Sequence, residues 1–246
     1  MDPITNAPTG AVPYVTTDQM REVDRVMVEE YGIVLLQMMG NAGRGLARLA
    51  RDRFLNRDAR RRNVVVLAGG GGNGGGLVCA RRLAGWGAAV QVWLSGAPEL
   101  LDRVPRHQLA ILERMGVPYR VAGDARFPLA DLVIDALVGH SLSGAPHGAE
   151  AALIREANAS DAAVLSLDVP SGVDAATGEV YEPAIEATAT LTLALPKEGL
   201  RGDDARLHVV ELYLADIGVP PELYARPTIG LEVAHVFAED ELLRIW

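Results

Sequence analysis

The chain has 246 residues, of which 49% are hydrophobic and 22% are charged. This is the composition of an ordinary globular protein with enough apolar material for a core, and it argues against disorder. The formal net charge is −9, and the chain has no basic block apart from the short run Arg60, Arg61 and Arg62. Binding of nucleic acid therefore has little electrostatic support.

Residues 1–15 are rich in Pro, Thr and Gly, which is typical of a flexible arm or of a segment that clasps a partner. They lack the basic and apolar stretches of a secretion signal, and no run of about 18 apolar residues occurs along the chain. We therefore expect a cytoplasmic protein that does not bind membranes, built as a single domain over residues 16–246.

Two helices are predicted to follow this arm. Thr16 and Gln19 have the spacing of a capping box, and apolar residues then recur at helical spacing as far as Gly32. The second helical pattern covers residues 33–55 and contains three glycines, each of which costs a helix about 1 kcal/mol relative to Ala. The presence of three glycines despite this cost predicts tight packing of this helix near a site.

From Asn63 onward, short apolar β-branched runs alternate with helical stretches. Continuous apolar runs suit strands that are buried on both faces of a parallel sheet, so the pattern predicts a Rossmann-like three-layer α/β/α sandwich with a largely parallel central sheet. The only cysteine, Cys79, falls in a helical stretch and is expected to be a small core residue. The apolar runs lie at 64–68, 88–94, 118–122, 130–139, 163–172, 188–196 and 206–218, and the helical stretches at 76–87, 97–116 and 149–160.

A glycine-rich turn at residues 69–76 follows the first of these strands. Gly69, Gly71 and Gly74 satisfy the pattern G-x-G-x-x-G, but the next strand ends without the acid of an ordinary NAD site, and the Gly-Lys-Ser/Thr of a Walker loop is absent. A turn without side chains at a helix amino end predicts contact with an anion or a nucleotide. A merely tight strand-to-helix turn is the alternative.

Two carboxylates, Asp135 and Asp168, come at the ends of apolar strands, where a charge needs a hydrogen bond, a partner or a cation. Either residue alone could be a helix cap or a turn former, but ligands of parallel sheets bind at this edge, so their joint position predicts a site. Asn73 and Ser171 add hard oxygen atoms that suit a group I or II cation. The five histidines have no zinc-site spacing, so zinc is not expected.

Lys197 is the only lysine among 23 basic residues, the other 22 being arginine. A chain so biased is expected to use arginine wherever a fixed positive charge suffices. Lysine differs from arginine in being compact and able to lose its proton, which is useful in acid–base chemistry. We therefore predict a functional role for Lys197, the alternative being a lysine retained by chance on a surface loop.

With these residues assembled, the chain resembles the NAD(P)H-hydrate epimerase family, also called the YjeF N-terminal domain. The matching segments in order are MREVDRVMVEEYGI, NAGR, VVVLAGGGGNGGGLVCARRLA, DLVIDALVGHSLSG, LSLDVPSGVDAATG, TLALPKEGL and YLADIGVP. The resemblance implies an isomerase that interconverts the R and S forms of hydrated NADH and NADPH for cofactor repair, so that a separate dehydratase can restore them. It also implies a possible homodimer.

The resemblance also implies roles for particular residues. Asp168 and Lys197 match the catalytic positions and are expected to share proton transfers at the hydrated ring carbon. One potassium ion would be held by Asn73, Asp135 and Ser171. The substrate-binding positions would be Gly72, Asn73, Gly74, Gly75, Gly139, His140, Ser141, Leu142 and Ser143.

The glycine turn departs from the family pattern G-x-G-N-N-G-G-D-G, because it reads GGGGNGGG and lacks the Asp. The acid that the family has before NAG is Gly40 in this chain. Two other hypotheses therefore stay open. One is a diverged homologue that uses the same Asp–Lys pair on another small molecule, as a biosynthetic tailoring enzyme. The other is a non-catalytic module that binds a ligand or a protein.

Overall fold

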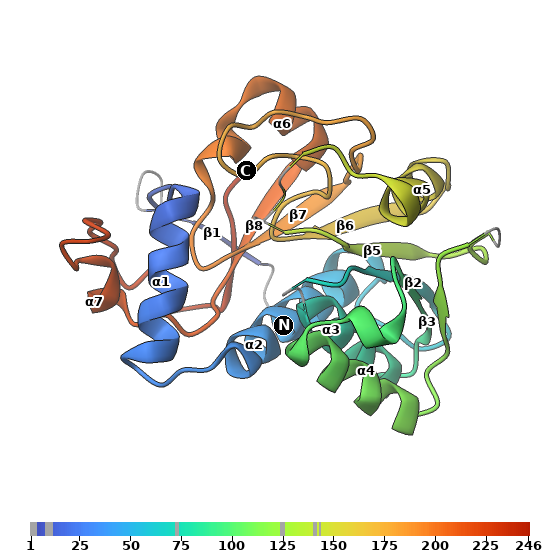
Figure 1. The fold of residues 1–246 in the computed structure, drawn as a ribbon. Helices are drawn as coiled ribbons and strands as arrows, with labels where there is room; N and C mark the ends of the chain where they lie inside the picture. The colour runs from blue at the N-terminus through green and yellow to red at the C-terminus, as the bar shows by residue number, and fades with distance from the viewer. Residues whose placement is uncertain (1–3, 8–11, 72–73, 124–125, 140–141, 143) are drawn as a thin grey trace.

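The protein is seen in a computed structural model that describes residues 4–7, 12–71, 74–123, 126–139, 142 and 144–246; it is a sheet covered by helices on both faces (Figure 1). Within these residues the strand order is β1-β9-β8-β7-β6-β5-β2-β3-β4, and neighbouring strands are parallel except β8 and β9. The predicted Rossmann-like sandwich with a largely parallel sheet is confirmed. The strands are β1 (Thr5–Asn6), β2 (Asn63–Ala68), β3 (Ala89–Leu94), β4 (Tyr119–Val121), β5 (Leu132–Ala136), β6 (Ala163–Leu167), β7 (Ala189–Leu193), β8 (Glu211–Ala215) and β9 (Leu242–Arg244).

Alternate side chains of β2 show how the sheet is covered. Val64 and Val66 pack in the core that includes α2, α3 and α4, whereas Val65 and Leu67 pack in the core that includes α5. This burial on both faces explains why the strands are continuous apolar runs. No helix of the described residues is long and apolar enough to cross a bilayer. The helices are α1 (Thr17–Glu29), α2 (Leu35–Leu49), α3 (Gly74–Gly85), α4 (Arg103–Arg114), α5 (Gly148–Asn158), α6 (Asp203–Val209) and α7 (Pro221–Tyr224).

The chain leaves the centre of the sheet in two directions. From β2 it proceeds outward to β3 and β4, whereas from β5, the other neighbour of β2, it proceeds outward through β6, β7 and β8. The helices that follow these strands, α3 after β2 and α5 after β5, therefore pack on opposite faces of the sheet. In open α/β sheets this switch point, at the carboxyl ends of the strands, is where ligands bind.

The described part of the amino-terminal arm, residues 4–7 and 12–15, is attached to the sheet, and the flexibility expected for residues 1–15 stays a prediction. Thr5 and Asn6 form β1, which pairs with β9, and Ala7 N–H donates to the Arg244 carbonyl at 2.8 Å. Val15 is fully buried and forms a β-bridge with Lys197. The arm is held by pairing with the edge of β9 and by burial of the apolar Val15 side chain. The Pro- and Gly-rich composition does not predict either contact.

The two predicted amino-terminal helices are present. At the start of α1, the Thr16 hydroxyl accepts from Gln19 N–H at 3.1 Å and the Gln19 side chain accepts from Thr16 N–H at 2.9 Å, so the capping box is confirmed. The second pattern forms α2 and continues as a π-helical turn at Ala50–Phe54. The apolar run at 206–218 is only partly a strand, because it contains the end of α6 as well as β8.

One of the three glycines in α2 is required by close packing against α3. A Cβ atom on Gly43 would lie 2.4 Å from the Gly75 carbonyl oxygen and 2.4 Å from the Val78 Cβ atom. No atom lies within 4 Å of the corresponding position on Gly40. The tight packing that the sequence predicted therefore depends most on Gly43, while a Cβ atom on Gly45 would also lie 3.2 Å from Leu242.

Gly43→Ala is expected to destabilise the protein by about 1–3 kcal/mol, because the methyl group would overpack the contact between α2 and α3. Gly40→Ala in the same helix is the matched control and is expected to be neutral or to stabilise by up to about 1 kcal/mol. Urea unfolding followed by circular dichroism measures both. Equal effects of the two substitutions would contradict this account.

Candidate functional site

The site lies beyond the carboxyl ends of β5, β6 and β7, which are neighbours in the sheet (Figure 1). Asp135 is next to last in β5, Asp168 directly follows β6, and Lys197 follows β7 after three loop residues. Parallel strands bring these three ends to one edge, so residues that are far apart in sequence share a neighbourhood.

Asp135 is completely buried and is held by neutral hydrogen-bond donors. Its carboxylate accepts from the Ser171 hydroxyl at 2.6 Å, from Ser171 N–H at 2.9 Å and from the Ser166 hydroxyl at 2.8 Å. Burial raises the pKa of Asp135, and these hydrogen bonds oppose the rise without cancelling it. The hydrogen bonds to the Asp135 carboxylate therefore do not fully offset the cost of burying its negative charge.

Ser171 joins the turn after β6 to the loop after β5. Its hydroxyl oxygen accepts from Val138 N–H at 3.0 Å and lies 3.3 Å from the Val138 carbonyl oxygen. The structure thus brings together Asp135 and Ser171, as the sequence predicts, and adds the Val138 carbonyl. Asn73, the third predicted ligand, lies outside the described residues. Hard oxygen atoms without a cationic hydrogen-bond partner are a donor set that suits an alkali cation.

Asp168 and Lys197 form a buried ion pair. Their relative exposures are 2% and 1%, and the Lys197 ammonium donates to Asp168 Oδ1. The ammonium also donates to the Leu193 carbonyl at 3.0 Å and to the Thr192 hydroxyl at 3.5 Å. A lone charge at this depth would be very unfavourable, so each partner requires the other.

The backbone at Asp168 has a left-handed conformation, which is rare for a residue with a side chain. Its φ is +69°, and Val169 N–H donates to the Leu167 carbonyl at 2.9 Å, which closes a γ-turn around Asp168. Ala194 after β7 repeats this geometry with φ of +62°. Such strain costs on the order of 1–3 kcal/mol and is typical of functional sites. Here it turns the Asp168 carboxylate toward Lys197 at the end of its strand.

Asp168 and Lys197 line a cavity of about 320 Å³. Gly71 and Gly139, from the two loops at the switch point, also line it. Sequence reasoning missed the helical part of the wall, which includes the acids Asp24 from α1 and Glu150 from α5. Asp24 lies within the matching segment MREVDRVMVEEYGI but has no predicted role there, and Glu150 lies outside the matching segments; each is one acid on a helix that the fold brings to the cavity. The remaining lining residues are Met20, Leu35, Met39, Leu137, Val138, Leu193 and Ile217.

The glycines of the turn at 69–76 pack closely against protein. A Cβ atom on Gly69 would lie 1.9 Å from the Leu137 carbonyl oxygen, and one on Gly74 would lie 2.8 Å from Val104. Gly75 would meet Leu167 at 3.0 Å. The turn is therefore glycine-rich at least in part because neighbouring elements leave no room for side chains. Gly72, His140, Ser141 and Ser143, which the sequence assigns to substrate binding, lie outside the described residues; Leu142 is described, and its N–H donates to the Gly139 carbonyl at 3.3 Å.

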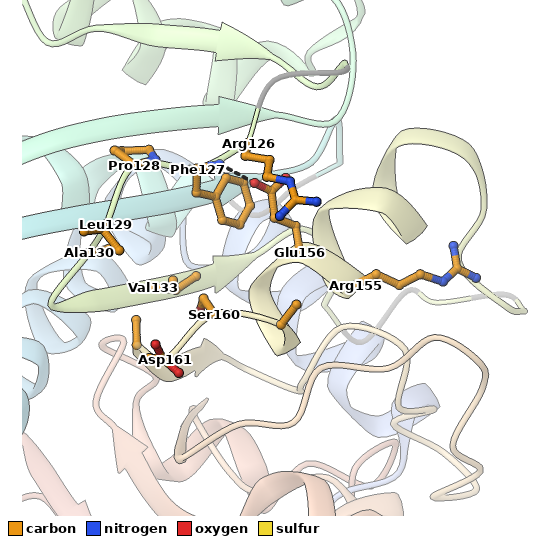
Figure 2. Close-up of a pocket in the computed structure, with 12 residues that line it drawn as sticks. Arg126, Phe127, Pro128, Leu129, Ala130, Val133, Arg155, Glu156, Ser160 and Asp161 are labelled. Atoms are coloured by element: carbon orange, nitrogen blue, oxygen red, sulfur yellow. Dashed lines mark hydrogen bonds between the residues drawn. The ribbon is translucent and has the colours of Figure 1, made fainter.

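A second cavity, of about 470 Å³, lies at the amino ends of the strands, beside the start of β5 and the end of α5 (Figure 2). Its wall includes Phe127, Val133 and Glu156, and the Glu156 carboxylate accepts a hydrogen bond from Phe127 N–H. It contains no residue that the sequence assigns to the site. The cavity at the carboxyl edge is therefore the candidate functional site.

Known proteins resemble the chain over most of its length. Residues 35–199 match the family model described as YjeF-related protein N-terminus. A protein named NAD(P)H-hydrate epimerase from Dehalogenimonas lykanthroporepellens is 46% identical over 90% of this chain and 89% of its own. One of the same name from Rhodopirellula baltica is 35% identical, with 88% of each chain covered.

Two further relatives extend the comparison. The match to the bifunctional NAD(P)H-hydrate repair enzyme Nnr of Moorella thermoacetica is 37% identical and spans 86% of this chain but only 41% of that protein. The crystal structure of yeast ynu0, YNL200c, shares the fold with a TM-score of 0.78 and 23% identity, and the match covers 95% of this chain and all of that one. The family match and these relatives together show that the chain belongs to the NAD(P)H-hydrate epimerase family of YjeF-related N-terminal domains.

Proposed function

We propose that the protein is an isomerase that interconverts the R and S forms of hydrated NADH and NADPH. The names of its relatives support this substrate class. The observation that carries the proposal is the buried pair of Asp168 and Lys197 in the wall of a cavity at the switch point of the sheet. A non-catalytic module would have no need for a buried, strained acid beside a cavity, and a diverged substrate is not favoured by relatives that share one activity name.

The chemistry requires a group that takes up a proton and gives it back. Hydration of the enamine double bond in a dihydronicotinamide ring puts a hydroxyl group on the carbon beside the ring nitrogen. To invert that carbon, its bond to oxygen or to nitrogen must break and re-form on the other face. Breaking the bond to nitrogen moves a proton off the hydroxyl group and later returns it, whereas breaking the bond to oxygen adds a proton to the hydroxyl group, releases water and frees a proton when water adds back. Neither route involves net oxidation. A positioned carboxylate performs this kind of general acid–base transfer.

Asp168 fits that role because it is buried, is paired with a lysine and is part of the cavity wall. Lys197 stabilises the carboxylate form, so Asp168 starts as a base. The cavity of about 320 Å³ is at the lower end of the range for small-molecule sites, which suits the hydrated ring and its ribose better than a whole dinucleotide. The diphosphate would then lie toward the glycine turn and the amino end of α3, near Gly74 and Gly75.

The donor set around Asp135 fits a potassium ion. The carboxylate is fully buried, and the hydrogen bonds it receives come from neutral groups. Asp135, Ser171 and the Val138 carbonyl would hold the ion together with Asn73. The ion would supply the missing positive charge, and its ligands would tie the loop after β5 to the turn after β6.

A dehydratase that consumes one epimer is the proposed pathway partner. Relatives from Moorella thermoacetica and Salinibacter ruber are named bifunctional repair enzymes, which is consistent with epimerisation acting beside a second repair step. The homodimer implied by the family resemblance stays a prediction.

Asp168→Asn is expected to lower the epimerisation rate by about 100-fold to 10,000-fold, because it removes the proton acceptor. The assay supplies mixed epimers of hydrated NADH and a dehydratase specific for one of them, and it measures consumption of the other. Since the single substitution leaves Lys197 buried without its charged partner, it is also expected to cost about 3–5 kcal/mol of stability.

The double variant Asp168→Asn/Lys197→Met is the control for that loss of stability. It removes both charges and is expected to restore the unfolding temperature but not the activity. Wild-type turnover in either variant would contradict the role of Asp168.

Potassium is expected to raise the unfolding temperature of the wild-type protein more than sodium or choline at equal ionic strength. The stabilisation would be on the order of 1–3 kcal/mol at saturating ion, because the ion binds the folded state only. Asp135→Asn is expected to abolish the difference between ions, since it removes the charged ligand. An equal response of the wild type to all three cations would rule out the site.

A further inference from the structure

The Lys197 ammonium has a protein acceptor for each of its three N–H groups. It donates to Asp168, to the Leu193 carbonyl at 3.0 Å and to the Thr192 hydroxyl at 3.5 Å. An ammonium has three donors and no acceptor, so these partners can satisfy it completely. A lysine held in this way has no donor left for a substrate unless one of these bonds breaks.

Thr192 occupies the point between the two charges. Its side chain is fully buried in β7, and its hydroxyl lies 3.5 Å from Asp168 Oδ1 as well as 3.5 Å from the Lys197 nitrogen. A hydroxyl can accept from the ammonium and donate to the carboxylate at the same time. Both distances are long for hydrogen bonds, and such contacts commonly shorten once substrate is bound.

Thr190, two residues earlier in the same strand, provides an internal comparison. It is equally buried, and because side chains alternate along a strand it shares a sheet face with Thr192. Its hydroxyl, however, donates to the Val209 carbonyl at 3.3 Å and makes no hydrogen bond with Asp168 or Lys197. Of the two buried threonines in this strand, Thr192 therefore hydrogen-bonds to both Asp168 and Lys197, whereas Thr190 hydrogen-bonds to neither.

We infer that Thr192 is a positioning residue for epimerisation, which completes the set of acceptors around Lys197 and aligns Asp168 beside it. Lys197 then acts as a fixed cation, and Asp168 alone exchanges the proton with the substrate, in place of the transfers shared by both residues that the sequence suggested. This inference rests on the proposed function. The other charged side chains among the described residues lining the cavity are Asp24 and Glu150.

The test compares Thr192→Val, which keeps the shape of the side chain, with Thr192→Ala, Thr192→Ser and Thr190→Val, using hydrated NADH and a dehydratase specific for one epimer. Loss of the Thr192 hydroxyl is expected to lower kcat by up to about 100-fold with KM within about twofold, as for a misaligned catalytic group. Thr192→Ser is expected to restore kcat, and Thr190→Val to leave it unchanged.

The pH profile of kcat/KM provides the readout that a purely structural role would not move. Without the hydroxyl, Asp168 loses a hydrogen-bond donor, so its charged form becomes less favourable. The acidic limb should move to higher pH in Thr192→Val and Thr192→Ala. The profiles of Thr192→Ser and Thr190→Val should match that of the wild type.

The outcomes separate this inference from the proposed function. An inactive wild-type protein would contradict the proposed function itself. An active wild type would overturn only the inference in either of two cases: if both variants without the Thr192 hydroxyl retain its kcat and pH profile, or if Thr190→Val shows the same losses. Thermal unfolding of each variant identifies a loss that comes from misfolding, and Thr192→Ala covers the case in which Thr192→Val does not fold.

Discussion

The buried ion pair between the Lys197 ammonium and the Asp168 carboxylate constrains the structure around it. Transfer of each ion from water costs several kcal/mol, and only a close partner with further hydrogen bonds offsets that cost. Neighbouring parts of the chain contribute: β7 supplies Thr192 and the Leu193 carbonyl, and the amino-terminal segment covers the Lys197 backbone through Val15. The strained backbone at Asp168 persists because these contacts determine its position.

The two acids of the site have different surroundings and therefore different chemistry. Asp168 has a cationic partner beside it, whereas the hydrogen bonds to Asp135 come from serine and backbone groups. The first arrangement stabilises the carboxylate form of an acid that lines the cavity. The second leaves a deficit of positive charge where the loops after β5 and β6 meet. Under the proposed function, proton exchange and loop fixation would fall to separate carboxylates at the ends of adjacent strands.

Much of this could be predicted from the sequence because the relevant signals are local. Apolar runs predict parallel strands, and strand ends then identify Asp135 and Asp168, while the scarcity of lysine identifies Lys197. The rest depends on contacts made by folding. Asp24 and Glu150 reach the cavity from separate helices, and Thr192 looks like any strand threonine. Strands as short as β1 and β9 have too few residues to show a periodicity.

The position of β9 between β8 and β1 has a consequence for the order of folding. Residues 5 and 6 pair with residues 243 and 244, so the amino-terminal strand lacks this partner until those residues have left the ribosome. Val15, which follows it, bridges to Lys197. During synthesis the parallel core can form first, whereas the pairing of the amino-terminal strand is completed late. Such a long sequence separation is typical of contacts that form slowly.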